Sequence, residues 1–127
     1  MRVTRRSTRW ISLAALLAAT LGACEAPPPS PPHAPGDREN GRLLLRQYGC
    51  GTCHTIPGVA AARGDVGPPL TLIARRAYVG GMLPNTPQNM ARWIESPRSI
   101  DPLTRMPDMQ VPPTHARDMV AYLYTLR

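Results

Sequence analysis

Cys50-Gly51-Thr52-Cys53-His54 is the stretch of this chain that decides how the rest folds. Two thiols separated by two residues can form thioether bonds to the two vinyl groups of one porphyrin. The histidine that follows directly can then donate a ring nitrogen to the iron. C-x-x-C-H is the attachment signature of c-type haem. The motif therefore predicts one covalent haem c, attached at Cys50 and Cys53, with His54 as an axial iron ligand.

Three other chemistries use the same pair of cysteines. A thioredoxin-like redox pair needs a βαβ setting, and the sequence shows none. A zinc site would have to take further ligands from His54, His33, His115 or Cys24, without a second paired motif. A simple disulfide is the third alternative. The histidine attached directly to Cys53, in a chain of this size, favours haem over all three.

Composition points to a small domain that needs a cofactor for its core. The chain has 127 residues, which fits one modest domain, and its aromatic content is 5%, with no Phe. So few large apolar side chains bury little surface, and such a domain usually needs a disulfide, a metal or a cofactor. No apolar run approaches the roughly 20 residues of a membrane span, which excludes a polytopic membrane protein.

The N-terminal 23 residues have the layout of a secretory signal. Four Arg precede a short apolar run at 10–23, which is too short to span a bilayer. The run ends in Leu21-Gly22-Ala23-Cys24, which resembles the lipobox of bacterial lipoproteins. In that family the peptide is cut before the cysteine, whose thiol receives a diacylglycerol. We therefore expect lipid attachment at Cys24 and export to the periplasmic side of a bacterial membrane. An ordinary signal peptide with a fortuitous cysteine is the alternative.

Removal of residues 1–23 changes the charge balance. The formal net charge of the whole chain is +7, but the signal holds four Arg and no acidic residue, so the mature chain carries +3. This modest charge removes most of the argument for a nucleic-acid binder. Six prolines crowd residues 24–36, which favours an extended polyproline II tether. The tether would join a lipid anchor to a folded domain at 37–127.

The residues after the tether predict a helical domain. Four helical segments are expected, at about 37–48, 71–79, 86–96 and 114–126. Gly80 and Gly81 are expected to end the second segment. Long loops rich in Gly and Pro cover 55–70 and 97–113, and no segment shows convincing strand alternation. The expected fold class is all-α, with about four short helices and long loops wrapped around one covalent haem.

Two of these segments carry clear boundary signals. Asp37 or Asn40 can cap the first helix. Thr86 is a good N-cap for the third helix, and Pro87 suits its first helical position. The third helix should stop before Pro97, because the residue before a proline disfavours the helical conformation.

The sixth iron ligand has several candidates in the mature chain. They are the thioether and imidazole side chains of Met82, Met90, Met106, Met109, Met119, His33 and His115. Met90 and Met119 lie on partly apolar helix faces and are expected to pack in the core. His115 stands at a helix start and is expected to face solvent. Met106 lies in a stiff, proline-flanked loop between the last two helices, which suits iron ligation, and Met109 is its nearest competitor.

Residues 37–127 resemble a class I cytochrome c domain. The closest similarity is to the cytochrome c domains fused to subunit II of bacterial haem–copper oxidases and to small free-standing relatives. The resemblance covers nearly all of the mature domain and rests on motifs that occur in the family's order. They are C-G-T-C-H at 50–54, G-P-P-L at 67–70, L-P-N-T-P at 83–87, R-W-I-E-S-P at 92–97, M-P-D-M at 106–109 and A-Y-L at 121–123.

The resemblance implies roles for residues beside the iron. In the family, the methionine of the M-P segment is the second axial ligand, which corresponds to Met106. The proline of G-P-x-L offers its carbonyl to the axial histidine, which corresponds to Pro68 and His54. That hydrogen bond would fix the imidazole ring and raise its basicity. Leu70 would line the haem face.

Further positions follow from the same resemblance. Arg76 lies where the family often places an arginine near a haem propionate, although a solvated helix face is the alternative. Trp93 lies where an aromatic ring packs beside the axial methionine. Gly41 and Tyr122 would mark the crossing of the first and last helices. The chain departs from mitochondrial members, which surround the haem edge with Lys, because all 15 of its basic residues are Arg.

A His/Met pair leaves the iron no open position for oxygen or a substrate. The expected function is therefore outer-sphere electron transfer, without enzymatic activity and without a small-molecule substrate. We expect a membrane-tethered monohaem carrier of single electrons in a respiratory chain. A quinol-oxidising complex would be its donor, and a haem–copper terminal oxidase its acceptor or host complex.

Three other functions remain open from the sequence. The first is the electron-relay haem subunit of a periplasmic dehydrogenase or reductase. The second is a haem sensor or peroxidase-like enzyme, which would have a labile sixth site. The third is a lipoprotein thiol–disulfide exchanger without haem.

Overall fold

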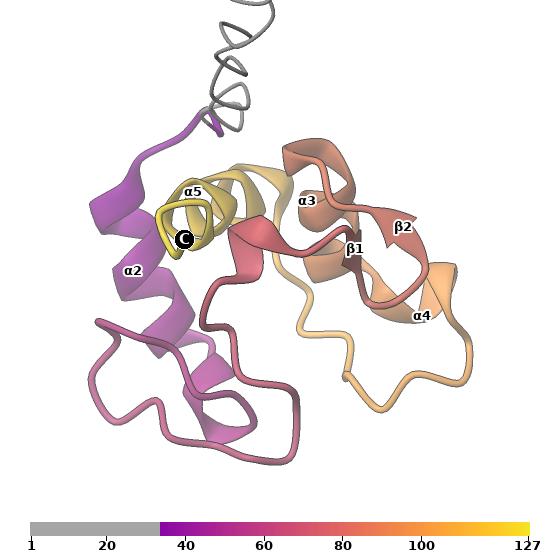
Figure 1. Ribbon diagram of the computed structural model, residues 1–127, viewed down its shortest axis with the longest axis horizontal. Coiled ribbons are helices and arrows are strands. Elements are labelled where there is room, and N and C mark those ends of the chain that lie inside the picture. The colour runs from indigo at the N-terminus through magenta and orange to yellow at the C-terminus, as the bar shows by residue number, and fades with distance from the viewer. Residues whose placement is uncertain (1–33) are drawn as a thin grey trace, which may run out of the picture. The chain divides into compact units, whose positions relative to one another are not determined.

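The computed structural model describes residues 34–127 (Figure 1). The signal peptide at 1–23, the lipid-attachment residue Cys24 and most of the proline-rich linker at 24–36 lie outside the described residues, so these three assignments remain predictions. Within residues 34–127, no helix combines the length and the apolar character needed to cross a membrane.

Three of the four predicted helices are present. They are α2 at Arg38–Gln47, α3 at Pro87–Glu95 and α5 at Pro113–Leu123. The carboxylate of Asp37 caps α2, because it accepts a hydrogen bond of 3.0 Å from the backbone N–H of Asn40. The hydroxyl of Thr86 caps α3 by accepting a hydrogen bond of 3.2 Å from the N–H of Asn89. Both predicted start signals are confirmed.

The crossing of α2 and α5 organises the core. Gly41 of α2 faces the backbone of α5, and a Cβ atom at this position would lie 1.9 Å from the carbonyl oxygen of Asp118. Only glycine therefore allows the two helices to approach this closely. α5 lies between α2 and α3 (Figure 1). The buried side chains of these helices include Leu44, Leu45, Met90, Ile94, Ala116, Met119, Val120 and Leu123, and the predicted packing role of the two methionines is confirmed.

The prediction of an all-α fold, expected as a class I cytochrome c fold, is wrong. A two-stranded antiparallel sheet joins β1 at Tyr78–Val79 to β2 at Leu83–Pro84, and of the helix expected at 71–79 only the 3₁₀ turn η2 at Ile73–Arg75 forms. Gly80 and Gly81 have φ angles of 58° and 73°, as the two central residues of a type I′ turn require. The N–H of Met82 closes this turn with a 3.1 Å hydrogen bond to the carbonyl of Val79, inside a three-residue loop between the paired Val79 and Leu83. The two glycines close a hairpin instead of ending a helix.

A further short helix follows α3 directly. α3 ends at Glu95 as predicted, but α4 at Pro97–Ile100 begins at the proline that was expected to open a long loop. Proline is well tolerated in the first turn of a helix, because its missing N–H has no partner there. The loop that remains between α4 and α5 covers residues 101–112.

The start of α2 is tied to α5 by one carboxylate. Asp118 accepts hydrogen bonds of 2.9 Å from the N–H of Asp37 and of 2.8 Å from the side-chain amide of Asn40. Both hydrogen bonds lower the pKa of Asp118 below its usual value, and the one from Asp37 has the larger effect. The deprotonated carboxylate therefore stabilises the folded state, and protonation weakens this tie.

We predict that Gly41→Ala destabilises the mature protein. The new methyl group would collide with a backbone oxygen that cannot rotate away, and overpacking of this kind costs roughly 1–3 kcal/mol. Because the clash is with backbone atoms of Asp118 and Met119, we expect the upper part of this range, which exceeds the gain of about 1 kcal/mol that alanine has over glycine in a helix. The thermal midpoint should fall, whereas the exposed control Gln47→Ala in the same helix should leave it nearly unchanged. A midpoint equal to or above that of the wild type would contradict the close crossing.

We also predict a specific acid sensitivity. Because the folded-state pKa of Asp118 lies below its unfolded value, its contribution to stability is present at neutral pH and is lost as the pH falls through the folded pKa, below about pH 4. Asp118→Asn should therefore flatten the acid limb of thermal stability plotted against pH. Asp65→Asn, at an exposed position, is the matched control. An unchanged acid limb in Asp118→Asn would refute the assignment.

Candidate functional site

The Cys50–His54 motif forms a tight turn at the end of α2. Gly49 reverses the chain with a left-handed φ of 70°, and the 3₁₀ helix η1 at Cys50–Thr52 follows it. The N–H of His54 then donates a 3.0 Å hydrogen bond to the carbonyl of Cys50. Residues three apart are eclipsed on a 3₁₀ helix, so Cys50 and Cys53 project from the same side of the turn. Neither thiol is in a disulfide.

The imidazole of His54 has a fixed orientation and a defined proton. Its Nδ1 lies 2.7 Å from the carbonyl oxygen of Pro68. Because a carbonyl only accepts hydrogen bonds, Nδ1 carries the proton and Nε2 keeps its lone pair. This is the tautomer that a metal-ligating histidine uses when its second nitrogen donates to the protein. This contact joins His54 to Pro68, the pair expected from the resemblance to class I cytochrome c domains.

Glycine at position 67 makes this contact possible. A Cβ atom on Gly67 would lie 2.4 Å from Cε1 of His54 and 2.7 Å from Nδ1. The backbone therefore forms a cradle beneath the ring that any side chain would fill. The N–H of Gly67 also donates a 2.7 Å hydrogen bond to the carbonyl of Cys53, which holds the cradle against the C-x-x-C-H turn.

The rest of the 55–70 loop is fastened to the same turn. The N–H of Gly64 donates to the carbonyl of Gly51 at 3.0 Å, and the N–H of Leu70 donates to the carbonyl of Thr55 at 2.8 Å. A Cβ atom on Gly64 would lie 2.4 Å from the carbonyl oxygen of Thr52. The packing of Gly64 was not predicted from the sequence, although its position between the motif and the G-P-P-L segment is a signal for it.

Tyr122 connects this loop to α5. Its hydroxyl donates a 2.7 Å hydrogen bond to the carbonyl of Pro57, and a Cβ atom on Gly58 would lie 2.2 Å from the same hydroxyl oxygen. The resemblance placed Tyr122 with Gly41 at the crossing of the first and last helices. The structure places Gly41 at that crossing, against Asp118, and the hydroxyl of Tyr122 on the loop.

The other predicted pocket residues contact the core, the hairpin or the G-P-P-L segment. Leu70 and Trp93 are partly buried and pack against the apolar core. A Cβ atom on Gly80 would lie 2.6 Å from the indole of Trp93, so the hairpin turn rests on this ring. The guanidinium of Arg76 donates a hydrogen bond to the carbonyl of Pro69, the residue that follows the histidine's partner.

Met106 lies in the second long loop. It is half-buried, and its N–H donates a 3.3 Å hydrogen bond to the hydroxyl of Thr104. Asp101 fixes the start of the loop by accepting a 3.0 Å hydrogen bond from the N–H of Leu103. Met109, the competing ligand, is more exposed, at 38%. The structure therefore joins Cys50, Cys53, His54 and Pro68 in one unit and holds Met106 in a separate, ordered loop.

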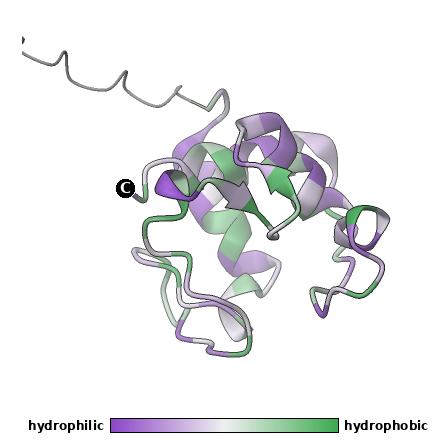
Figure 2. Cartoon of the chain, turned by 45° about the vertical axis from the view of Figure 1, so that its right-hand side comes forward, coloured by the Kyte–Doolittle hydropathy of each residue, from purple (hydrophilic) through white to green (hydrophobic). Residues whose placement is uncertain are grey.

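Both long loops expose apolar side chains. Val66 on the first is 79% exposed and Leu103 on the second is 91% exposed. The two loops extend from the same side of the helices, on opposite flanks (Figure 1), and each mixes hydrophobic with hydrophilic residues (Figure 2).

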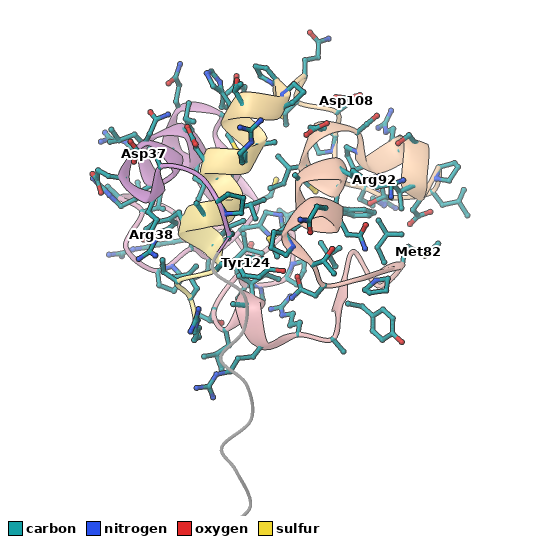
Figure 3. The ribbon with its side chains drawn as sticks, turned by 90° about the horizontal axis from the view of Figure 1, so that it is seen from above. Asp37, Arg38, Met82, Arg92, Asp108 and Tyr124 are labelled. Atoms are coloured by element: carbon teal, nitrogen blue, oxygen red, sulfur yellow. The ribbon has the colours of Figure 1, made fainter. Side chains whose placement is uncertain are left out.

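His115 does not face solvent freely, and that prediction is wrong. It is half-buried, and its Nδ1 lies 2.9 Å from the hydroxyl of Tyr48. The two rings meet edge to face, with centroids 5.9 Å apart. The contact between His115 and Tyr48 thus joins the start of α5 to the end of α2, so the role of His115 in this structure is to connect the two helices. Met82, another candidate ligand, projects at the tip of the hairpin (Figure 3) and is 54% exposed.

The described residues bear on two of the alternatives to haem. No group of three His, Cys, Asp or Glu side chains between residues 34 and 127 is placed to hold a zinc ion. Cys24 and His33, two of the ligands considered for zinc, lie outside the described residues. Burial raises the pKa of the Cys50 thiol, whereas a thiol–disulfide exchanger needs a lowered one. Covalent haem requires two thiols that can form thioether bonds to the porphyrin and an imidazole nitrogen that can bind the iron. Cys50 and Cys53 are free thiols on one side of the turn, and Nε2 of His54 is available. The residues therefore fit this cofactor.

Comparison with known proteins assigns no family to this geometry. No protein-family model matches the chain, and a search of curated proteins finds no match. The functional interpretation therefore depends on the C-x-x-C-H turn, the contact between His54 and Pro68, and the sequence motifs around them.

We predict that Met106, and not Met109, completes the iron coordination of the haem-loaded protein. Met106→Ala should abolish the weak iron–sulfur charge-transfer band, lower the redox potential and allow the reduced protein to bind carbon monoxide rapidly. Met109→Ala, three residues away in the same loop, is the matched control and should keep the wild-type spectrum. Loss of the band in Met109→Ala alone would transfer the assignment to Met109.

Proposed function

We propose that residues 37–127 form a monohaem c-type cytochrome that carries single electrons. The observation that supports this proposal most strongly is the 2.7 Å contact between Nδ1 of His54 and the carbonyl of Pro68, beside two free thiols. A histidine that follows a C-x-x-C pair has no evident structural need for a fixed tautomer. It has one if Nε2 binds iron.

Each residue of the site has a definable part in this function. When bound, the haem supplies a reversible one-electron couple. Cys50 and Cys53 would hold it covalently, and the Pro68 carbonyl orients the imidazole of His54 and would make it a stronger iron ligand. Met106 would supply a thioether, which favours the reduced state. With His54 and Met106 both bound to the iron, no position would be open to a substrate, which suits a carrier rather than an enzyme.

We propose that this carrier works at a membrane, tethered through a lipid on Cys24. The lipobox-like sequence and the proline-rich linker support this arrangement. A tether raises the effective concentration of the domain near membrane partners without a tight interface. The proposed partners are a quinol-oxidising donor complex and a haem–copper terminal oxidase, in a respiratory chain on the periplasmic side.

Two variants of the full-length protein test attachment and tethering separately. Cys50→Ser/Cys53→Ser should yield a protein without haem absorption after denaturation, because no thioether bond can form. Cys24→Ser should keep the wild-type haem spectrum but move to the soluble exported fraction. Each variant thus controls for the other.

Three results would contradict parts of the proposal. Haem that survives denaturation in the double serine variant would refute attachment at these cysteines. Membrane retention of Cys24→Ser would refute the lipid anchor. Co-purification of the wild type with a dehydrogenase instead of an oxidase would replace the proposed partner with the electron-relay role.

A further inference from the structure

The Gly67–Leu70 segment has an unusual shortage of backbone hydrogen-bond donors. Hydrogen bonds fix both ends of the segment. The N–H of Gly67 donates to the carbonyl of Cys53, and the N–H of Leu70 donates to the carbonyl of Thr55. Between them stand two successive prolines, which have no N–H to donate. The carbonyls of Pro68 and Pro69 are therefore the only backbone groups that can fix the middle of the segment.

Side chains engage both of these carbonyls. The Pro68 carbonyl accepts from Nδ1 of His54, and the Pro69 carbonyl accepts from the guanidinium of Arg76. The two carbonyls belong to successive peptide units that meet at the Cα of Pro69. The ring of Pro69 fixes its φ, so its ψ is the one backbone torsion that sets the angle between the two carbonyls. By holding the Pro69 carbonyl, Arg76 restrains this torsion and, with it, the Pro68 carbonyl that orients the histidine.

Arg76 is itself firmly anchored. Its carbonyl accepts a 2.8 Å hydrogen bond from the side-chain amide of Asn85, which also donates at 2.8 Å to the carbonyl of Ile73. The amide oxygen of Asn85 accepts a 3.2 Å hydrogen bond from the hydroxyl of Tyr124. Tyr124 is buried, and it lies in the middle of the molecule as viewed in Figure 3. A chain of hydrogen bonds therefore connects the core to the Pro69 carbonyl.

We propose that Arg76 is a positioning residue for His54. By donating to the Pro69 carbonyl, it holds the Pro68 carbonyl in place and so maintains the hydrogen bond that makes the imidazole a strong iron ligand. This inference rests on the proposed haem function. It assigns Arg76 a role through the backbone, in addition to any contact that its positive charge makes with a haem carboxylate.

The two roles of Arg76 predict opposite changes in redox potential. A weaker hydrogen bond at Nδ1 lowers the basicity of the imidazole, which favours the reduced state and raises the potential. Loss of a positive charge near the iron favours the oxidised state and lowers the potential. Arg76→Lys keeps the charge but loses the planar guanidinium with its fixed donor geometry. This variant therefore isolates the positioning role.

The experiment uses haem-loaded full-length protein. Solvent exchange of the His54 Nδ1 proton is measured by NMR in the reduced state, and the potential by redox titration. Arg76→Lys should raise the potential and speed this exchange at least about tenfold, the loss expected for one hydrogen bond from a charged donor. Gly67→Ala, which disturbs the ring directly, should do the same. Arg75→Lys, at the exposed neighbouring position, should match the wild type.

Asn85→Ala provides a second variant that leaves all charges unchanged. It removes the anchor of Arg76 and should shift the potential and the exchange rate in the same direction. Arg76→Gln removes the positive charge as well as the guanidinium. If Arg76→Lys has the exchange rate and potential of the wild type while Arg76→Gln has a lowered potential, the inference is overturned and charge is the only role of Arg76. If Arg76→Lys does not mature, wild-type values in Asn85→Ala would overturn it. A wild type that never acquires haem would instead overturn the proposed function, and this inference with it.

Discussion

The hydrogen bond between Nδ1 of His54 and the Pro68 carbonyl is the contact on which the candidate site depends. It joins the turn that carries the two thiols to a loop without regular secondary structure. Ordering such a loop costs conformational entropy at every residue. The cost is offset locally by backbone hydrogen bonds to the turn and by glycines at the points of closest approach. The imidazole is thereby held in the tautomer and orientation that iron ligation requires.

The helices provide the frame for this arrangement. α2 crosses α5 closely at Gly41 and leads directly into the C-x-x-C-H turn, while Tyr122 of α5 reaches the loop at Pro57. The loop is therefore attached to both helices of the crossing. The second loop, which carries Met106, is ordered by its own short-range hydrogen bonds. The proposed cofactor would add apolar surface to the core of a small domain with few aromatic residues.

Local signals in the sequence correctly predicted three of the four expected helices. They failed where one signal suits two structures and where a contact joins residues far apart in the sequence. Asp37 and Thr86 marked the starts of α2 and α3, because capping depends on neighbouring residues. The hairpin at Gly80 and Gly81 was missed, because two glycines suit both the end of a helix and a tight turn between strands. The contact of His115 with Tyr48 joins residues 67 positions apart, so no local pattern could reveal it.

The candidate site was predictable to the extent that it lies within a motif. The spacing of Cys50, Cys53 and His54 is itself the chemical requirement for covalent haem. The pairing of His54 with Pro68 came from the resemblance of G-P-P-L to a known motif. The contact of Arg76 with the Pro69 carbonyl could not be read from the sequence, since it depends on how the segment after Leu70 turns back. The structure adds the geometry around the motif to the residues that the motif names.

The intact mass of the exported wild-type protein tests the central claim most directly. A protein matured in cells that attach c-type haem should have the mass of its processed polypeptide, its lipid and one covalently bound haem. A mass that corresponds to the lipidated polypeptide alone would contradict this account of the chain.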